Sequence, residues 1–207
     1  MWLGDIAALP PDIAPDICSP AEQDRARRFA SRGDAARYLQ TRALLRQLLS
    51  AYVGQPPEAI GIDEAKDGKP YVRDGAIAFN LSHSGPCVAI AVRVGAEPEA
   101  GLGVDVQHGR RADELALARS LFADSEIAML AGLGKAARHR PFFRLWACRE
   151  AVLKTSGLGM KGGMKGRGFS LRLDARGAYA VHALSPAWNA IALHEFQPRR
   201  DVFGALA

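Results

Sequence analysis

The chain has 207 residues, of which 48% are hydrophobic and 24% are charged, and it carries a formal net charge of +5. This composition excludes disordered and collagen-like chains, and no apolar run is long enough to cross a bilayer. The start shows no secretory signal pattern, and the three cysteines, Cys18, Cys87 and Cys148, are too scattered for a zinc site, so we expect a cytoplasmic protein with reduced thiols.

The first predicted elements are a strand and a long helix. Residues 1–9 form a short strand that ends at two prolines. A helix follows, with Asp34 as its N-cap and with leucines at helical spacing until Gly54 and Pro56 end it.

Seven arginines lie in or just before this helix. Such a density of positive charge is typical of a solvated helix face or of a site for an anionic ligand, and the residues alone leave both readings open. An aromatic ladder, an RNP-like string and a zinc-finger spacing are all missing from the sequence, so we expect no nucleic-acid partner. The arginines are Arg25, Arg27, Arg28, Arg32, Arg37, Arg42 and Arg46.

A β-hairpin is predicted over residues 77–94. In the first strand Ile77, Phe79 and Leu81 share one face, and Asn80 and Ser82 share the other. A turn at residues 84–86 leads into a second strand whose valines and isoleucine also alternate, which favours antiparallel pairing.

The second half begins with a strand over residues 101–107, in which Asp105 and Gln107 lie on the same face. Two helical segments follow at 112–122 and 125–133, the second capped by Asp124 or Ser125. A further helix contains WACREAVLK, residues 146–154. Three strands, at 169–174, 178–184 and 189–196, close the chain.

Both halves run through helix and then strand hairpin, and residues 190–192 repeat the Ala-Ile-Ala of residues 89–91. This favours an α+β fold of two similar lobes packed as a pseudo-dimer, residues 1–100 and 101–207, with the boundary in the loop at 95–101. A ligand that touches both lobes would lie in the groove between them.

The helix that contains residues 146–154 carries an acid and a lysine four residues apart. Leu145, Cys148 and Val152 form its apolar stripe, and Glu150 and Lys154 lie on the flank, so we expect an accessible Glu150. The pair is either a surface ion pair, stabilising an isolated helix by about 0.2–0.5 kcal/mol, or a catalytic pair. Two carboxylates and an amide oxygen, from Asp105, Glu150 and Gln107, would suit a hard cation such as magnesium.

These residues resemble a known family. GVDVQ and WACREAVLK are similar to the paired signature of Sfp-type 4′-phosphopantetheinyl transferases, G(I/V)DxE and WxxKEAxxK. GKP at residues 68–70, FNLSHS at 79–84 and RRFASRGDAAR at 27–37 extend the resemblance in the family's order. It implies the same two-lobed pseudo-dimer.

The resemblance implies transfer of the phosphopantetheine arm of coenzyme A to a serine of an acyl or peptidyl carrier protein. Asp105 and Glu150 would ligate Mg²⁺, or Mn²⁺ as an alternative, with Gln107 at the position of a third ligand. Glu150 would act as the base for the incoming hydroxyl, and Lys154 would neutralise or protonate the leaving phosphate. An inactive relative that binds coenzyme A or a nucleotide is the alternative.

The same resemblance implies the contacts with coenzyme A. Arg25 and Arg37 would grip the 3′-phosphate, and Lys69 would lie near the adenine. The phosphate contacts would come from Ser82, His83, Arg149 and Lys154. The residues themselves also allow exposed arginines, a turn lysine and an ordinary hairpin end at these positions.

GLGMKG at residues 157–162 has the GxGxxG form but follows a helix, so it is not a dinucleotide fingerprint, and no Walker A motif is present. We interpret this glycine-rich basic segment as a loop near coenzyme A or an acidic carrier helix. The pseudo-dimer leads us to expect a monomer with no membrane partner.

Overall fold

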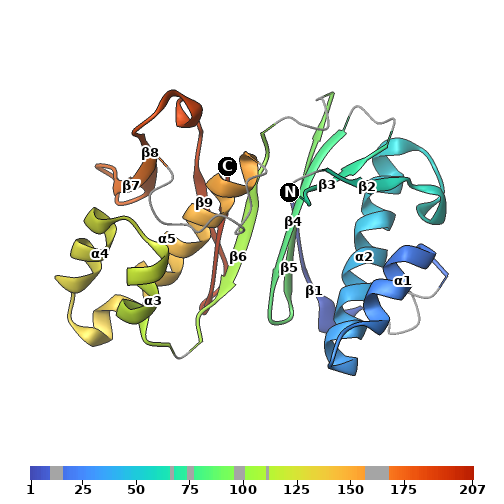
Figure 1. Ribbon diagram of the computed structural model, residues 1–207, viewed down its shortest axis with the longest axis horizontal. Coiled ribbons are helices and arrows are strands. Elements are labelled where there is room, and N and C mark those ends of the chain that lie inside the picture. The colour runs from blue at the N-terminus through green and yellow to red at the C-terminus, as the bar shows by residue number, and fades with distance from the viewer. Residues whose placement is uncertain (10–15, 66–67, 74–76, 96–100, 111, 157–167) are drawn as a thin grey trace.

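The computed structural model describes residues 1–9, 16–65, 68–73, 77–95, 101–110, 112–156 and 168–207. Two lobes lie side by side, each with a sheet facing the other lobe and helices on its outer side (Figure 1). In the described part of the chain, no helix is both long enough and apolar enough to cross a membrane.

The first lobe is built on a three-stranded antiparallel sheet of order β1-β5-β4, beside a two-stranded β2-β3 pair. The hairpin of β4 and β5 confirms the prediction, with Asn80 opposite Ala91 and Ser82 opposite Ala89. The elements are β1 (Trp2–Asp5), η1 (Ile6–Ala8), α1 (Pro20–Arg27), α2 (Arg32–Val53), η3 (Pro57–Ala59), β2 (Ile62–Glu64), β3 (Pro70–Val72), β4 (Ile77–Ser84) and β5 (Cys87–Val94).

The second lobe repeats this plan. Its three-stranded antiparallel sheet has the order β6-β10-β9, and β7 and β8 form a separate pair. The elements are β6 (Val104–His108), α3 (Glu114–Leu121), α4 (Asp124–Ala131), α5 (Lys135–Thr155), β7 (Phe169–Leu173), β8 (Tyr179–Ala183), η5 (Pro186–Trp188), β9 (His194–Arg199) and β10 (Val202–Leu206). Equal strand order around one long helix in each lobe confirms the predicted α+β pseudo-dimer.

The long helix α2 begins differently from the prediction. Ser31 is its N-cap and accepts a hydrogen bond from the Asp34 N–H, so Asp34 lies in the first turn. The end is as predicted, because Gly54 adopts the left-handed conformation, with φ of 73°, that favours glycine. The predicted cap of α4 is also wrong, since Ala123 precedes that helix and its N–H donates to Glu126.

The closing strands differ most from the sequence analysis. Residues 190–192 lie before β9, outside any strand, so their match to residues 89–91 is not a structural repeat. The counterpart of the central strand β5 is β10, which was not predicted. A Cβ on Gly204 of β10 would lie 2.3 Å from the Phe196 ring, so this strand requires glycine where β9 packs against it.

The three largest apolar clusters of the described residues organise the core. One lies in each lobe, between its sheet and its long helix. The third joins the lobes, because small residues of β4 and β5 pack against Val104 and Val106 of β6 and against Leu102, which precedes that strand. The lobes therefore meet through a shared apolar layer, which fixes the polar side chains beside it.

Candidate active site between the lobes

Strand β6 is held beside β4 by side chains. On one edge, the backbone of β6 pairs with β10, and Gly103 just before β6 exchanges two backbone hydrogen bonds with Ala207. The N–H groups of Val104, Val106 and His108 point the other way and donate to the side chains of β4. Their acceptors are Asn80 Oδ1 at 2.9 Å, Ser82 Oγ at 3.3 Å and Ser84 Oγ at 2.9 Å.

Asp105 lies on β6 at the centre of this contact, and 2% of the residue's surface is exposed. Its Oδ1 accepts hydrogen bonds from Ser82 Oγ at 2.8 Å and from Lys154 Nζ at 2.7 Å. Its Oδ2 accepts one from Gln107 Nε2 at 2.8 Å. Three elements, β4, β6 and α5, therefore fix the direction of one carboxylate.

The close packing of α5 on β6 depends on Gly103. A Cβ at this position would lie 2.0 Å from the Ala151 carbonyl oxygen of α5. Only glycine allows this approach, which brings Lys154 within 2.9 Å of the Val104 carbonyl oxygen. The glycine of the GVD segment thus has a packing role.

Glu150 of α5 is buried, with 6% of its surface exposed, so the expectation of an accessible side chain is wrong. Its Oε1 atom has no hydrogen-bond partner within the described residues. Burial and, to a smaller extent, the negative charge of Asp105 raise the pKa of Glu150 to about 7, against the opposing effects of Lys154 and of the hydrogen bond with Trp146. The helix flank becomes interior because α5 packs against β6 and β10 of the same lobe.

The alternative of a surface ion pair between Glu150 and Lys154 is also wrong. The ammonium group of Lys154 lies on Asp105 and on the backbone of β6. Lys154 and Glu150 therefore belong to one three-residue cluster with Asp105. Within this cluster the Oε1 atom of Glu150 accepts no hydrogen bond.

This arrangement fits a divalent cation. A buried carboxylate oxygen without a partner is costly, and a nearby second carboxylate adds repulsion that a cation would relieve. Protein side chains in the described residues form no group of three or more His, Cys, Asp or Glu able to hold a metal. A site here would thus use Asp105, Glu150 and oxygen atoms of another kind, such as phosphate or water.

Lys69 reaches the same cluster from the first lobe. Its Nζ donates to the Leu102 carbonyl at 3.2 Å and to the Lys154 carbonyl at 3.0 Å. A cation at the last carbonyls of α5 is favourable for the helix dipole. Lys69 therefore joins the start of β6 to the end of α5.

His83 and Arg37 lie near the cluster, on the first-lobe side. His83 is exposed at the surface, yet partial desolvation of its imidazole lowers the pKa, and the positive charges of Lys154 and Arg37 lower it further. A lowered pKa favours the neutral ring, in which one nitrogen donates and the other accepts a hydrogen bond. Arg37 forms an ion pair with Asp34 on the surface of α2.

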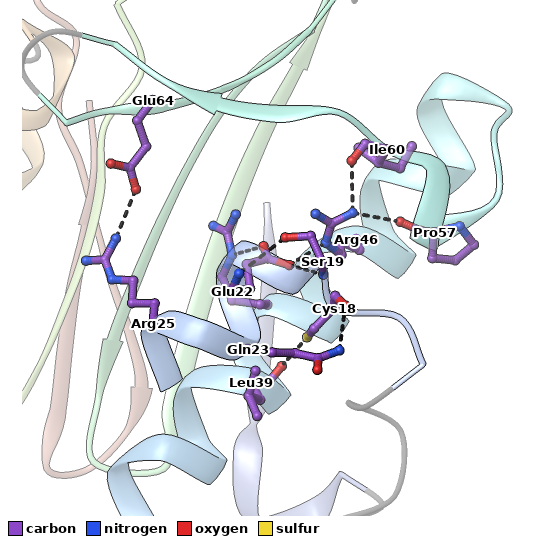
Figure 2. A network of polar contacts seen from close by, with 11 residues as sticks. Cys18, Ser19, Glu22, Gln23, Arg25, Leu39, Arg46, Pro57, Ile60 and Glu64 are labelled. Carbon is purple, nitrogen blue, oxygen red and sulfur yellow. Dashed lines mark hydrogen bonds and ion pairs between the residues drawn. The ribbon is translucent and has the colours of Figure 1, made fainter. Parts of the chain in front are cut away.

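Arg25 stands apart, on α1. It pairs with Glu64 of β2 at 2.9 Å, as Figure 2 shows, and its guanidinium lies over the Tyr38 ring at 5.6 Å. A pocket of about 720 Å³ is lined by Arg25, Arg28, Phe29, Glu64 and their neighbours. The pocket could bind an anionic group attached to a planar ring. In this structure the Arg25 guanidinium is paired with the Glu64 carboxylate.

The assignment of Arg149 to coenzyme A is wrong. Its side chain is fully buried, pairs with Glu126 at 2.8 Å and lies over the Phe169 ring at 4.6 Å. Arg149 points away from Glu150 because successive helical residues lie about 100° apart. It ties α5 to α4 and β7.

A second pocket, of about 330 Å³, opens on the other side of Gln107. It is lined by His83, Gln107, His108, Phe143 and Trp146, among others. The glycine-rich segment at 157–162 lies outside the described residues, as do residues 96–100 of the predicted lobe boundary.

Sequence reasoning gave no role to Asn80 and Ser84. Both belong to the alternating Asn-x-Ser-x-Ser pattern of β4, and their buried or half-buried side chains accept the β6 N–H groups. The alternation was visible, but the identity of the partner strand was not.

Comparison with known proteins supports one family. The profile of the 4′-phosphopantetheinyl transferase superfamily matches residues 101–202, and that of the 4′-phosphopantetheinyl transferase N-terminal region matches residues 12–95. The chain is similar to 4′-phosphopantetheinyl transferase HetI of Nostoc sp., 32% identical over 72% of this chain and 63% of HetI.

Two Bacillus proteins are also similar. The transferase psf-1 of Bacillus pumilus is 34% identical over 73% of this chain and 62% of its own length. The transferase Sfp of Bacillus subtilis is 29% identical over 79% of this chain and 70% of its own length. The chain thus spans less than two thirds of HetI and psf-1.

Proposed function

The chain belongs to the 4′-phosphopantetheinyl transferase superfamily, and from this premise we propose that it transfers the 4′-phosphopantetheine arm of coenzyme A to a serine of an apo acyl or peptidyl carrier protein. Adenosine 3′,5′-bisphosphate would be released. The observation that carries the proposal is the buried pair Asp105 and Glu150 beside Lys154, at the junction of the two lobes.

The chemistry assigned to this chain is proton transfer and charge neutralisation. The carrier serine oxygen forms a bond to the phosphorus that bears the pantetheine, and the bond from that phosphorus to the bridging oxygen breaks. Glu150 accepts the serine proton, directly or through a water, and a pKa of about 7 suits such a base. Lys154 neutralises or protonates the leaving phosphate.

The proposal includes Mg²⁺, with Mn²⁺ as an alternative, held by Asp105 and Glu150. When bound, the ion supplies positive charge to the pyrophosphate oxygens. The unpartnered Oε1 of Glu150 supports this assignment. Gln107 directs its amide N–H toward Asp105, which leaves its carbonyl oxygen for a water of the ion rather than for a direct contact.

Coenzyme A would lie across the lobe junction. We place its 3′-phosphate toward Arg25 and Arg37, its adenine toward Lys69, and its pyrophosphate beside His83 and Lys154. Ser82 is 7% exposed, and its hydroxyl already bonds Asp105 and the Val106 N–H, so it acts on the phosphates through Asp105. The 330 Å³ pocket beyond Gln107 is the place for the pantetheine arm.

We propose that the lobes divide at residues 100 and 101 and that the protein acts as a monomer, because both lobes of one chain contribute to the cluster. The three buried free cysteines suit a reducing compartment, and a cytoplasmic location belongs to the proposal.

The test is incubation of the protein with coenzyme A, Mg²⁺ and an apo-carrier, followed by mass spectrometry of the carrier. A mass gain of one phosphopantetheine that disappears with Glu150→Gln supports transfer. Binding of coenzyme A by calorimetry without any mass gain, over a panel of apo-carriers, would favour an inactive binding relative. The observation on that side is Gln107, which stands where many members of the family have an acid.

A further inference from the structure

The side-chain ladder between β4 and β6 has a consistent geometry. Each acceptor on β4 lies 24 positions before its donor on β6, from Asn80 with Val104, through Ser82 with Val106, to Ser84 with His108. Alternate residues of two extended strands advance by the same distance, about 6.6–6.8 Å. Three side chains can therefore serve three N–H groups in a single register.

This ladder replaces a backbone partner for an edge strand. β6 is the outer strand of its sheet, and its outward N–H groups face the first lobe, where those of Val104 and Val106 are buried and that of His108 is partly buried. Buried N–H groups without acceptors are strongly disfavoured, so a shift of β6 along β4 would cost all three bonds together. The apolar contacts of Leu102, Val104 and Val106 do not by themselves fix this position, because dispersion has little directional preference.

The middle rung couples the register to the cluster of carboxylates. Ser82 accepts from the Val106 N–H and donates its own hydroxyl to Asp105 Oδ1. Asn80 and Ser84 hold the strand on either side of this rung but contact neither Asp105 nor Glu150 through any hydrogen bond of the described residues. Their two hydrogen bonds hold β6 on both sides of Asp105 and so bear on the position of Asp105 along the strand relative to α5.

From this we infer that Asn80 and Ser84 are positioning residues for the divalent cation, an inference that rests on the proposed function. Loss of either acceptor lets β6 slide or tilt, so that Asp105 and Glu150 no longer meet at one distance. Partners that orient a metal ligand typically change metal affinity by about 10- to 100-fold when they are removed.

The experiment is a titration of Mn²⁺ in the presence of saturating coenzyme A, with free Mn²⁺ measured by electron paramagnetic resonance. Asn80→Ala and Ser84→Ala should each weaken Mn²⁺ binding about 10-fold. Ser84→Thr retains an oxygen acceptor in a strand that favours β-branched residues, and it should bind Mn²⁺ within about twofold of the unmodified protein.

Leu81→Ala is the matched control, because Leu81 lies on the same strand but packs into the first-lobe core on the opposite face. It should lower the melting temperature and leave Mn²⁺ affinity unchanged. Equal losses of Mn²⁺ affinity in Leu81→Ala and Asn80→Ala, or unchanged affinity in both alanine variants of the ladder, would overturn the inference. Normal Mn²⁺ binding without any carrier modification would instead contradict the proposed transfer and leave the ladder intact.

Discussion

The two lobes share one scaffold, but the side chains next to it at the lobe junction differ in charge. In each, a short helix precedes the long one, and its glutamate reaches back to the N–H of the N-cap while binding arginine on the long helix. Glu22 of α1 accepts from the Ser19 N–H and from Arg46 of α2, as Figure 2 shows. Glu126 of α4 accepts from the Ala123 N–H and from Arg149 of α5.

The lobes differ in the side chains that lie next to this glutamate–arginine ion pair. The first lobe presents cations, with Arg37 on α2 and Lys69 after β2, whereas α5 presents the buried acid Glu150. The proposed transfer needs both kinds of side chain, cations to bind the phosphates of coenzyme A and an acid to accept a proton and hold a metal ion. The repeated ion pair therefore supports the scaffold of both lobes, and single positions next to it differ in charge and chemistry.

The largest effect is expected at the residue that has no counterpart in the first lobe. Glu150→Gln keeps the shape of the side chain but removes the base and one charge of the cation site. Transfer to an apo-carrier should fall by at least about 100-fold, the usual lower bound for loss of a general base. Steady-state mass spectrometry measures the rate, and retention of more than a tenth of it would remove Glu150 from the mechanism.

The two ion pairs, Glu22 with Arg46 and Glu126 with Arg149, can be removed separately. Glu126→Gln leaves Arg149 charged in a fully buried place, and we expect a loss of about 3–5 kcal/mol of unfolding free energy together with a lower kcat, because Arg149 adjoins Glu150. Glu22→Gln should cost less, about 2–3 kcal/mol, since Arg46 keeps the Pro57 and Ile60 carbonyls.

Urea denaturation measures both losses. Kinetics then separates the lobes, because Glu22→Gln should raise KM for coenzyme A through Arg25, one turn along α1, and leave kcat unchanged. The opposite pattern, with kcat reduced by Glu22→Gln and KM raised by Glu126→Gln, would reverse the roles given to the lobes.

The buried acid should also make metal-free stability depend on pH. The pKa of Glu150 rises from 4.5 in the unfolded chain to about 7 in the folded one, so the folded state binds the proton more tightly. The advantage is present at low pH and is lost as pH rises through about 7, by roughly 3 kcal/mol in total. Compared with Glu150→Gln, the unmodified protein should lose stability between pH 5 and pH 8. A constant difference would place Glu150 in contact with solvent.

The smallest effect is expected where the lobes meet a second time. Arg199 of β9 pairs with Asp5 of β1 at 2.6 Å, and the arginine side chain is 52% exposed. Exposed ion pairs contribute about 0–1 kcal/mol. Arg199→Ala should therefore change the unfolding free energy by less than about 1 kcal/mol and leave Mn²⁺ affinity intact. A loss as large as that of Asn80→Ala would make the two junctions equivalent.

Much of the fold could be predicted because it is written in local periodicity. The hairpin of β4 and β5 and the shared face of Asp105 and Gln107 on β6 follow from alternation, whereas α5 is buried on every side from Ala147 to Leu153 and not along one stripe. The central strand β10 escaped because it is short, buried over most of its length and without alternation. Helix α1 had a readable signal, a Ser19 and Glu22 capping box, that the arginine content of the region obscured.

Local patterns in the sequence identify the residue types able to do the chemistry and the face of the strand or helix on which each lies. The burial of Glu150, the interior position of Arg149 and the binding of Lys154 to Asp105 instead of Glu150 depend on how the elements pack together. These features differ in the distance along the chain over which they are set. Backbone geometry sets the direction of a side chain from its neighbours in sequence, but its partner and its exposure to water depend on segments 20 to 50 positions away, whose packing no local pattern contains.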